Sequence, residues 1–278
     1  MADPERSTEL LWGEGARRGL SAGLIVRTAV GLADAEGLSA VSMRRVAREL
    51  GVTVMSLYRH VPGKAELVAL MCDAVLAPED DEVAGGGAEG GWRKSLETWA
   101  RAGIALRRRH PWLAEAPEER RIPGPNAVAL FERALAAVEP TGLPPARVVA
   151  VVTLVGGFVD SAARQEAERL RAEERSGVGH EEWWSARDSL YAHMDRYPVL
   201  TRLYENGAYD DPPDPFEFGL QRVLDGVEML VRTEGRDQTS DESRCKVCGE
   251  PVPTAGTGRP RDYCSRACRQ RAYRMRRK

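Results

Sequence analysis

The sequence predicts an all-α protein: a small N-terminal helical domain, a larger helical bundle and a C-terminal module rich in cysteine. Three observations support this prediction. Between residues 21 and 231 the apolar residues recur at the three- and four-residue spacing of amphipathic helices. No segment alternates apolar and polar residues between hairpin turns, as half-buried strands do. Four of the five cysteines fall within the last 35 residues, which sets that end of the chain apart.

The composition is that of an ordinary globular protein. The 278 residues are 42% hydrophobic and 29% charged, which suits about two domains with buried cores. These values exclude a wholly disordered or collagen-like chain. The longest apolar stretch, residues 148–159, is too short to span a bilayer and is typical of a buried core helix. The N-terminus has no signal peptide with a basic and then an apolar part, so we expect a cytoplasmic protein.

The small net charge of −2 conceals a strong asymmetry along the chain. Residues 244–278 hold eleven Lys and Arg residues against two acidic residues, a net charge of +9. Residues 1–243 therefore carry about −11. A basic segment of this density is typical of a module with an anionic partner.

The N-terminal part divides into an arm, a group of short helices and a linker. Residues 1–20 are polar and contain several glycines, which predicts a flexible arm. Residues 21–76 form a compact domain whose helices are opened by a capping Ser or Thr or ended by Gly or Pro. The acidic, Gly-rich residues 77–91 then predict a linker. The four helices are expected at residues 21–36, 43–50, 54–60 and 64–76.

The second part, residues 92–231, contains longer helical segments separated by clusters of Pro and Gly. The polar residues 232–243 predict a second linker, which leads into the cysteine module at 244–278. Five helices are expected, at residues 92–110, 126–138, 145–175, 180–197 and 216–231.

The second and third short helices have the spacing of a helix-turn-helix. Gly51 permits a tight turn, and Ala47 and Leu57 can form the small apolar joint between the two helices. The outward side of the following helix then offers hydroxyls, a guanidinium and an imidazole for phosphates and base edges. On spacing alone, a helical hairpin that merely packs remains the alternative.

The residues themselves favour DNA binding. The stretch SMRRVARELGVTVMSLYRHVPGKAELV, residues 42–68, closely resembles the tetracycline-repressor (TetR) family of bacterial transcriptional regulators. The resemblance implies a homodimer that binds a palindromic operator and represses until a small molecule binds its C-terminal domain. It places DNA-contact positions of the family on Ser42, Arg44, Met55, Ser56, Tyr58, His60 and Lys64.

Each of these side chains has a chemistry that suits DNA. Tyr58 and Lys64 can hold phosphates and so fix the register, whereas Arg44 is the best candidate for a contact to guanine. Each charged side chain is otherwise an ordinary solvated surface group. The full predicted DNA-binding set is Ser42, Arg44, Thr53, Met55, Ser56, Tyr58, Arg59, His60 and Lys64.

Residues 92–231 are expected to form an all-helical regulatory and dimerisation domain. The segments HPWLAEAP (110–117) and GPNAVALFERAL (124–135) resemble the C-terminal half of the tetracycline repressors. The residues that hold the drug–magnesium complex there have no match here, although Gln165 and Glu166 lie near the expected carboxylate, so tetracycline is not the expected effector. A candidate effector pocket, with core packing as the alternative role, is lined by Trp99, Leu106, Trp112, Phe131, Val155 and Phe158.

The resemblance also implies how the dimer forms. In this family the last two long helices of each protomer form a four-helix bundle in the dimer. Here the resemblance implies that these helices are residues 145–175 or 180–197, together with 216–231. Trp183, Trp184 and Tyr191 are further candidates for the dimer interface, where aromatic residues are enriched.

The cysteine module has the spacing of a metal site. Cys245-x2-Cys248, fifteen residues and then Cys264-x3-Cys268 place four thiolates in two close pairs, which suits tetrahedral Zn²⁺. A site closed by four cysteines predicts a structural ion rather than a catalytic one. The rivals are a redox dithiol or two disulfides, which a reducing cytoplasm disfavours.

The zinc site would hold a basic helix. The stretch YCSRACRQRAYR, residues 263–274, resembles small treble-clef-like zinc knuckles. Its side chains suit nucleic-acid phosphate. A solubilising tail, or an RNA or protein partner, is the alternative. The candidate nucleic-acid contacts are Arg266, Arg269, Arg271, Tyr273 and Arg274.

The favoured function is therefore a ligand-responsive, dimeric transcriptional repressor with a zinc-stabilised basic tail, in the bacterial cytoplasm and associated with the nucleoid. Its expected partners are operator DNA, a second copy of the chain and a small-molecule effector, but no membrane. The rival from another class is an enzyme. Against it, the sequence has no nucleophile motif, no phosphate-cradling glycine loop and no His-x3-His pair.

Overall fold

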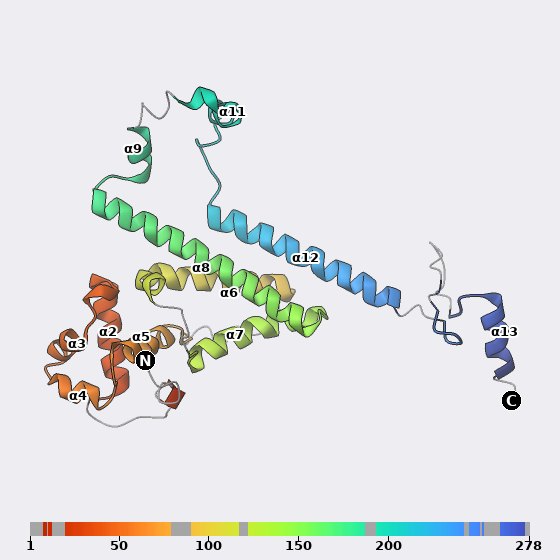
Figure 1. Ribbon diagram of the computed structural model, residues 1–278, viewed down its shortest axis with the longest axis horizontal. Coiled ribbons are helices and arrows are strands. Elements are labelled where there is room, and N and C mark those ends of the chain that lie inside the picture. Colours follow the sequence, from red (N-terminus) through yellow and green to blue (C-terminus); the bar gives the residue numbers. More distant parts are fainter. Residues whose placement is uncertain are drawn as a thin grey trace.

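The computed structural model describes residues 8–9, 11–12, 20–78, 90–116, 122–186, 193–241, 245–250, 252 and 262–275. In this part of the chain all regular structure is helical, which confirms the predicted all-α class (Figure 1). The N-terminal domain contains α2 (Ala22–Glu36), η1 (Leu38–Ala40), α3 (Met43–Glu49), α4 (Val54–Tyr58) and α5 (Lys64–Ala74).

The elements that follow form the regulatory domain and the cysteine module. Up to Thr141 they are α6 (Gly91–Arg109), η3 (Pro111–Glu115), α7 (Pro125–Val138) and η4 (Glu139–Thr141). After these come α8 (Pro145–Ser176), α9 (His180–Ser185), η5 (Met194–Arg196), α11 (Pro198–Glu205), α12 (Pro215–Asp241) and α13 (Arg266–Met275).

The N-terminal helices close around one core because each presents an apolar face to the others. Ile25, Val46, Leu57 and Leu67 are all fully buried in it. Hydroxyl groups open three of the helices: the side chains of Ser21, Ser42 and Thr53 accept backbone N–H bonds in the first turns of α2, α3 and α4.

The regulatory core is formed by α6, α7, α8 and α12, which pack side by side (Figure 1). Its fully buried members include Leu96, Val155 and Leu224. Helix α8 is long and apolar enough to cross a membrane by length and composition, with 33% of its most apolar window buried. Its inward side chains lie in this core, so α8 is the buried core helix that the apolar stretch at 148–159 predicts.

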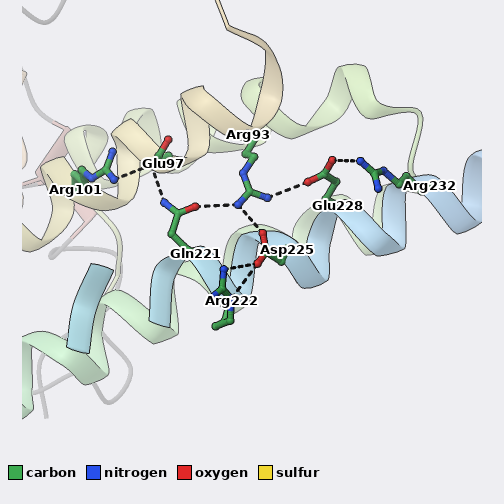
Figure 2. A network of polar contacts seen from close by, with 8 residues as sticks. All are labelled: Arg93, Glu97, Arg101, Gln221, Arg222, Asp225, Glu228 and Arg232. Atoms are coloured by element: carbon green, nitrogen blue, oxygen red, sulfur yellow. Dashed lines mark hydrogen bonds and ion pairs between the residues drawn. The ribbon is translucent and has the colours of Figure 1, made fainter. Parts of the chain in front are cut away.

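A polar network ties α6 to α12 along their length (Figure 2). The guanidinium of Arg93 on α6 lies 2.7 Å from Asp225 and 3.1 Å from Glu228, both on α12. Gln221 donates to Glu97 at 2.8 Å and accepts from Arg93 at 2.9 Å. The hydrogen bond from Arg93 lowers the pKa of Asp225, so its carboxylate stays ionised over a wider pH range.

Two helices differ from the sequence prediction. The helix expected at 180–197 is interrupted: α9 ends at Ser185, and only the short turn η5 follows within the described residues of that range, without a proline or glycine to account for the break. Helix α11 begins separately at Pro198, because proline disfavours helical backbone at the residue before it. The helix expected to end at 231 continues to Asp241, and residues 232–241 contain no proline that would break it. Residues 187–192, including Tyr191, lie outside the described part.

Five residues of the predicted flexible arm are described, and four of them, residues 8, 9, 11 and 12, are helical. Leu11 is 9% exposed, and the indole N–H of Trp12 donates to the carbonyl of Pro123 at 3.4 Å. These contacts show that this part of the arm packs on the domains instead of extending into solvent.

Candidate functional site

The helix-turn-helix has the joint that its sequence predicts. Ala47 on α3 and Leu57 on α4 are both buried, and the backbone N–H of Val52 donates to the Ala47 carbonyl at 3.0 Å. Gly51 has a φ of +66°, a conformation that side-chain-bearing residues rarely adopt. The short turn thus holds α4 at a fixed angle to α3.

Two members of the predicted DNA-binding set, Ser42 and Thr53, cap helices, and a third, Ser56, pairs with the second cap. Ser42 Oγ accepts from the Arg45 N–H at 3.2 Å, and Thr53 Oγ1 accepts from the Ser56 N–H at 3.3 Å. The hydroxyls of Thr53 and Ser56 lie 2.9 Å apart. These hydroxyls therefore order the starts of α3 and α4, where backbone N–H groups also favour a phosphate.

The remaining members of the set lie on α3, on and just after α4, and on the first turn of α5, and all but His60 are exposed. Met55 is 72% exposed and Tyr58 is 42% exposed, although Leu57 between them is fully buried. Arg44, Arg59 and Lys64 are exposed as well, and His60 is half-buried. The structure thus collects hydroxyl, aromatic, thioether and cationic side chains around one small helix, a composition suited to phosphates and base edges.

The predicted effector pocket is not one cluster. Trp112 does not line the regulatory domain: it is 1% exposed and belongs to the core of the N-terminal domain, which corrects its assignment. The short helix η3 turns back from α6 onto α2 and carries Trp112 with it. Trp99, Val155 and Phe158 lie in or against the regulatory core, whereas Phe131 is 40% exposed; Leu106 is half-buried.

One carboxylate that the sequence reading missed joins the two domains. Asp34 on α2 accepts from the indole N–H of Trp112 at 2.6 Å and lies 2.6 Å from the ring nitrogen Nδ1 of His110. His110 ends α6, as its place before a proline predicts. On η3 itself, the Glu115 carboxylate pairs with Arg171 of α8 at 2.8 Å.

Asp73 forms a second junction between the domains. It is 8% exposed on α5, and its carboxylate accepts from the backbone N–H of Ala127 at 2.9 Å in the first turn of α7. The Asn126 side chain donates to Asp73 as well. Any side chain at Gly124 would overlap the carboxylate. The sequence does contain one signal for a buried, hydrogen-bonded carboxylate at this position: Asp73 is the single acidic residue within the apolar run LVALMCDAV.

A cavity lies between these two junctions. Its volume is about 180 Å³, and its lining comes from α5, α6, η3 and α8. An ion pair between Arg107 and Asp160 contributes to its wall. None of the six predicted pocket residues lines this cavity, whose lining is Cys72, Leu76, Arg107, Leu113, Ala114, Asp160, Ala163 and Arg164.

Glu166 on α8, near the carboxylate position of the tetracycline repressors, pairs with an arginine of α6. Glu166 accepts from Arg108 at 3.0 Å, and Gln165 donates to Ser161 at 3.2 Å. Neither residue lines the cavity.

The four cysteines of the C-terminal module converge. Their sulfur atoms all lie within 4.8 Å of one another, with 3.4 Å between Cys248 and Cys264 and 3.7 Å from each of these to Cys268. A tetrahedral ion with Zn–S bonds of 2.3 Å would separate its sulfurs by about 3.8 Å. The cluster could thus hold a metal ion.

Backbone contacts shape this cluster. The Cys245 N–H donates to the Glu250 carbonyl at 2.8 Å, and the Gly249 N–H donates to the Cys245 carbonyl at 2.9 Å. Desolvation raises the pKa of the Cys245 thiol, but backbone N–H groups of Cys264, Val247 and Cys248 outweigh it and lower the pKa to about 6. Hydrogen bonding with Cys248 raises the pKa of Cys264 to about 12.

The candidate nucleic-acid contacts of the tail lie on α13. Arg266, Arg269, Arg271, Tyr273 and Arg274 are all exposed, while Cys268 is buried in the cluster.

Comparison with known proteins gives two matching family models. Residues 25–71 match the bacterial regulatory proteins of the tetR family, and residues 86–231 match the tetracyclin repressor-like C-terminal domain. The matched ranges end before the first cysteine of the tail.

Individual relatives agree with these matches. The HTH-type transcriptional repressor DrrR1 of Streptomyces coeruleorubidus is 44% identical over 238 residues, covering 82% of this chain and 87% of the relative. An HTH-type transcriptional regulator of Saccharopolyspora erythraea is 32% identical, covering 76% of this chain and 85% of the relative. The crystal structure of ActR from Streptomyces coelicolor in complex with actinorhodin is 29% identical, with a TM-score of 0.61, and covers 76% of this chain and 96% of ActR.

Proposed function

This chain belongs to the tetR family of bacterial regulatory proteins, and we propose that it binds a palindromic operator as a homodimer through α3, α4 and the start of α5. It is a transcriptional repressor and not an enzyme. As a member of this family it works in the cytoplasm, and binding to DNA would associate it with the nucleoid. The observation that supports this interface best is the exposure of Met55 and Tyr58 on a helix that the buried Leu57 fixes to the core.

The proposed roles follow from the position of each side chain. Lys64 and Tyr58 hold phosphates, because both are exposed beside the turn and offer an ammonium group and a hydroxyl to phosphate oxygens. Arg44 and Met55 reach base edges, where a guanidinium suits guanine and an apolar side chain suits the thymine methyl. The remaining polar members, Ser42, Thr53, Ser56, Arg59 and His60, order the helix ends or add phosphate contacts.

The dimer would form through the outer sides of α8 and α12. Leu154 on α8 is 55% exposed, and Phe218 on α12 is 54% exposed. A second copy of the chain would cover these apolar side chains, since two-fold interfaces bring the same patch of both subunits together. Two DNA-binding domains would then reach successive major grooves, about 34 Å apart.

A small organic effector would act where the two domains meet. ActR has been solved with actinorhodin and with (S)-DNPA, which supports an organic ligand for this relative as well. The cavity between α5, α6, η3 and α8 is small for a drug-sized ligand, so an effector entering it would push these elements apart. The Asp34 and Asp73 contacts beside it would pass that displacement to the DNA-binding domain.

The four cysteines of the tail would hold Zn²⁺. Four sulfurs at tetrahedral separations, two of them buried, are the donor set of structural zinc sites. The ion would link the segment around Cys245 to the start of α13 and so stabilise a module that is too small to bury a core of its own.

Binding to DNA selected from random duplexes tests the operator interface. Replacing both Tyr58 and Lys64 with Ala should weaken binding to every sequence. The loss of the Lys64 charge should also reduce the salt slope by about 0.9, since only a cationic side chain neutralises a phosphate and releases its counterion. Arg44→Ala should instead relax the preference at one base pair. Arg133→Ala, an exposed change on α7, is the matched control. Unchanged affinity and slope in the double variant would contradict the assignment.

Metal analysis of the purified chain tests the zinc site. We expect one zinc per chain in the wild type and none after replacement of Cys248 and Cys264 with Ser. Cys72→Ser, on α5, controls for the loss of a thiol elsewhere. Zinc retained at one ion per chain in the double variant would contradict the site.

A further inference from the structure

The exposed side of α13 carries cationic and aromatic side chains over a helix that the cysteine cluster anchors. Cys268 is buried against the cysteine cluster and Ala272, one turn later, is half-buried, which fixes the inward side of the helix. Arg266, Arg269 and Tyr273 follow one another at helical spacing, three and four residues apart, on the side that faces away. The cluster thus anchors one side of α13 and leaves the other open.

Charge on this helix is unbalanced. The sequence of α13 contains four arginines and no acidic residue. Within the described residues none of these guanidinium groups has a carboxylate partner, whereas Arg93 and Arg101 on α6 and Arg169 and Arg171 on α8 all form ion pairs. The segment 244–278 as a whole carries a net charge of +9. Among the described residues, this surface therefore has no counter-charge.

We propose that α13 is a second DNA-binding surface, which contacts phosphates of duplex DNA independently of sequence and is held in shape by the metal at the cysteine cluster. The inference rests on the zinc site proposed above. Guanidinium groups form strong, paired hydrogen bonds with phosphate oxygens. Neutralised phosphates release counterions, which supplies the binding free energy without any base contact.

Duplex DNA fits this surface better than other polyanions. A helix with arginines along one side can follow a line of phosphates, whereas single-stranded nucleic acid is held mainly by stacking on several aromatic side chains. Tyr273, 61% exposed, is the aromatic side chain on α13. The rest of the chain also brings DNA to the tail, because a dimer bound to its operator raises the local concentration of duplex around both tails.

The tail would contact DNA away from the operator half-site. Helix α12 leads away from α3 and α4 (Figure 1), so the chain enters the cysteine module at a distance from the helix-turn-helix. The tail would therefore strengthen binding to flanking or separate duplex, rather than add contacts within the half-site that α4 occupies.

The test compares three forms of the full-length, zinc-loaded chain, each in the Tyr58→Ala/Lys64→Ala background that weakens the helix-turn-helix. The first keeps the tail, the second carries Arg266→Gln, Arg269→Gln and Arg274→Gln, and the third is a matched control. That control removes the same charge from the regulatory domain, at Arg133, Arg175 and Arg202, all of them exposed. Binding to a duplex without the operator is measured at several salt concentrations.

We expect the tail variant to bind this duplex on the order of tenfold more weakly and with a salt slope reduced by about 2.7, three times 0.9. The control should match the form with an intact tail. Replacing Cys248 and Cys264 with Ser should cause the same loss as the tail variant. Affinity and slope equal to those of the control would overturn the proposal, as would single-stranded RNA of equal length competing better than the duplex.

Failure of this inference can be told apart from failure of the proposed function. With Tyr58 and Lys64 restored, the tail variant should bind an operator duplex trimmed to its two half-sites as the wild type does. A wild-type chain that selects no operator contradicts the proposed function, whatever the tail binds.

Discussion

The two hydrophobic cores of this chain are closed in different ways. The core around Ile25, Val46 and Leu57 is enclosed within one protomer. Trp112, on the short helix η3 that follows α6, completes this core. The regulatory core buries Leu96, Val155 and Leu224, but α8 and α12 still expose large apolar side chains on their outer sides. The DNA-binding domain therefore buries its core within one chain, whereas the regulatory domain leaves an apolar surface that a second copy of the chain could cover.

The difference also shows where the domains meet. The linker at 77–91 separates them in sequence, yet Trp112, just after the first helix of the regulatory segment, lies inside the N-terminal core. A change of shape in the regulatory domain can thus reach the DNA-binding domain through packed contacts as well as through the chain itself.

The largest expected effect comes from Trp112, because its removal opens the enclosed core. Trp112→Ala should lower the free energy of unfolding by about 3–5 kcal/mol, as expected for a fully buried aromatic residue. Trp112→Phe keeps most of the volume but loses the hydrogen bond to Asp34, so it should cost less. Chemical denaturation measures both. Trp99→Ala, at the other core, is the comparison; equal stability of Trp112→Ala and the wild type would contradict the shared core.

The next effect tests the open face of the regulatory domain. Replacing Leu154 and Phe218 with Glu should weaken the dimer by about 3 kcal/mol, roughly a hundredfold, since each charge would be buried twice in a two-fold interface. Analytical ultracentrifugation measures the dissociation constant. Val128→Glu changes an exposed apolar residue of α7 and should leave the dimer intact. A double variant that stays as dimeric as this control would place the interface elsewhere.

The Asp73 contact should contribute about 2 kcal/mol. Asp73→Asn keeps one accepting oxygen but replaces the other, which faces N–H donors of Asn126 or Ala127, with an NH2 group that can only donate, at a buried position. Thermal unfolding should show the loss, and hydrogen exchange at Asn126 and Ala127 should accelerate. Asp211→Asn, at an exposed position, serves as the control. Unchanged exchange at the start of α7 would show that Asp73 does not hold this junction.

The smallest expected effect concerns the ion pairs between α6 and α12. The hydrogen bond from Arg101 lowers the pKa of Glu217 below its ordinary value of 4.5. Its folded-state pKa is depressed, so the pair stabilises the fold above that value and the contribution is lost as the pH falls through the folded pKa. Glu217→Gln should cost about 0.5 kcal/mol at pH 7, because exposed ion pairs are weak. It should cost less at pH 3, which lies below the ordinary pKa of 4.5. An equal cost at both pH values would exclude the charge as its cause.

The sequence predicts local structure well wherever the signal is local. Hydroxyls at Ser42 and Thr53, a glycine at 51 and an apolar joint are all within about ten residues, so the helix-turn-helix follows from spacing and capping. The convergence of the four cysteines is likewise foreseen by their spacing.

Contacts between distant segments are harder to predict. Trp112 follows an apolar helix and so suggests a wall of the regulatory domain, but the turn at His110 and Pro111 returns it to α2, more than 70 residues earlier in the chain. No local sequence pattern indicates the roles of Asp34 and Asp73, because their partners lie on distant elements: the His110 ring for Asp34 and the start of α7 for Asp73. Pairings of this kind depend on how the helices pack against one another, and the periodicity of apolar residues in the sequence does not specify that packing.

The central claim is that the DNA-binding domain folds within one protomer while the regulatory domain pairs with a second copy. The most direct test is the site that the chain selects from random duplex DNA, together with the mass of the resulting complex. We expect an inverted repeat whose half-sites lie about one helical turn apart, with two protomers bound to it. A selected site without inverted symmetry, bound by a single protomer, would contradict the account.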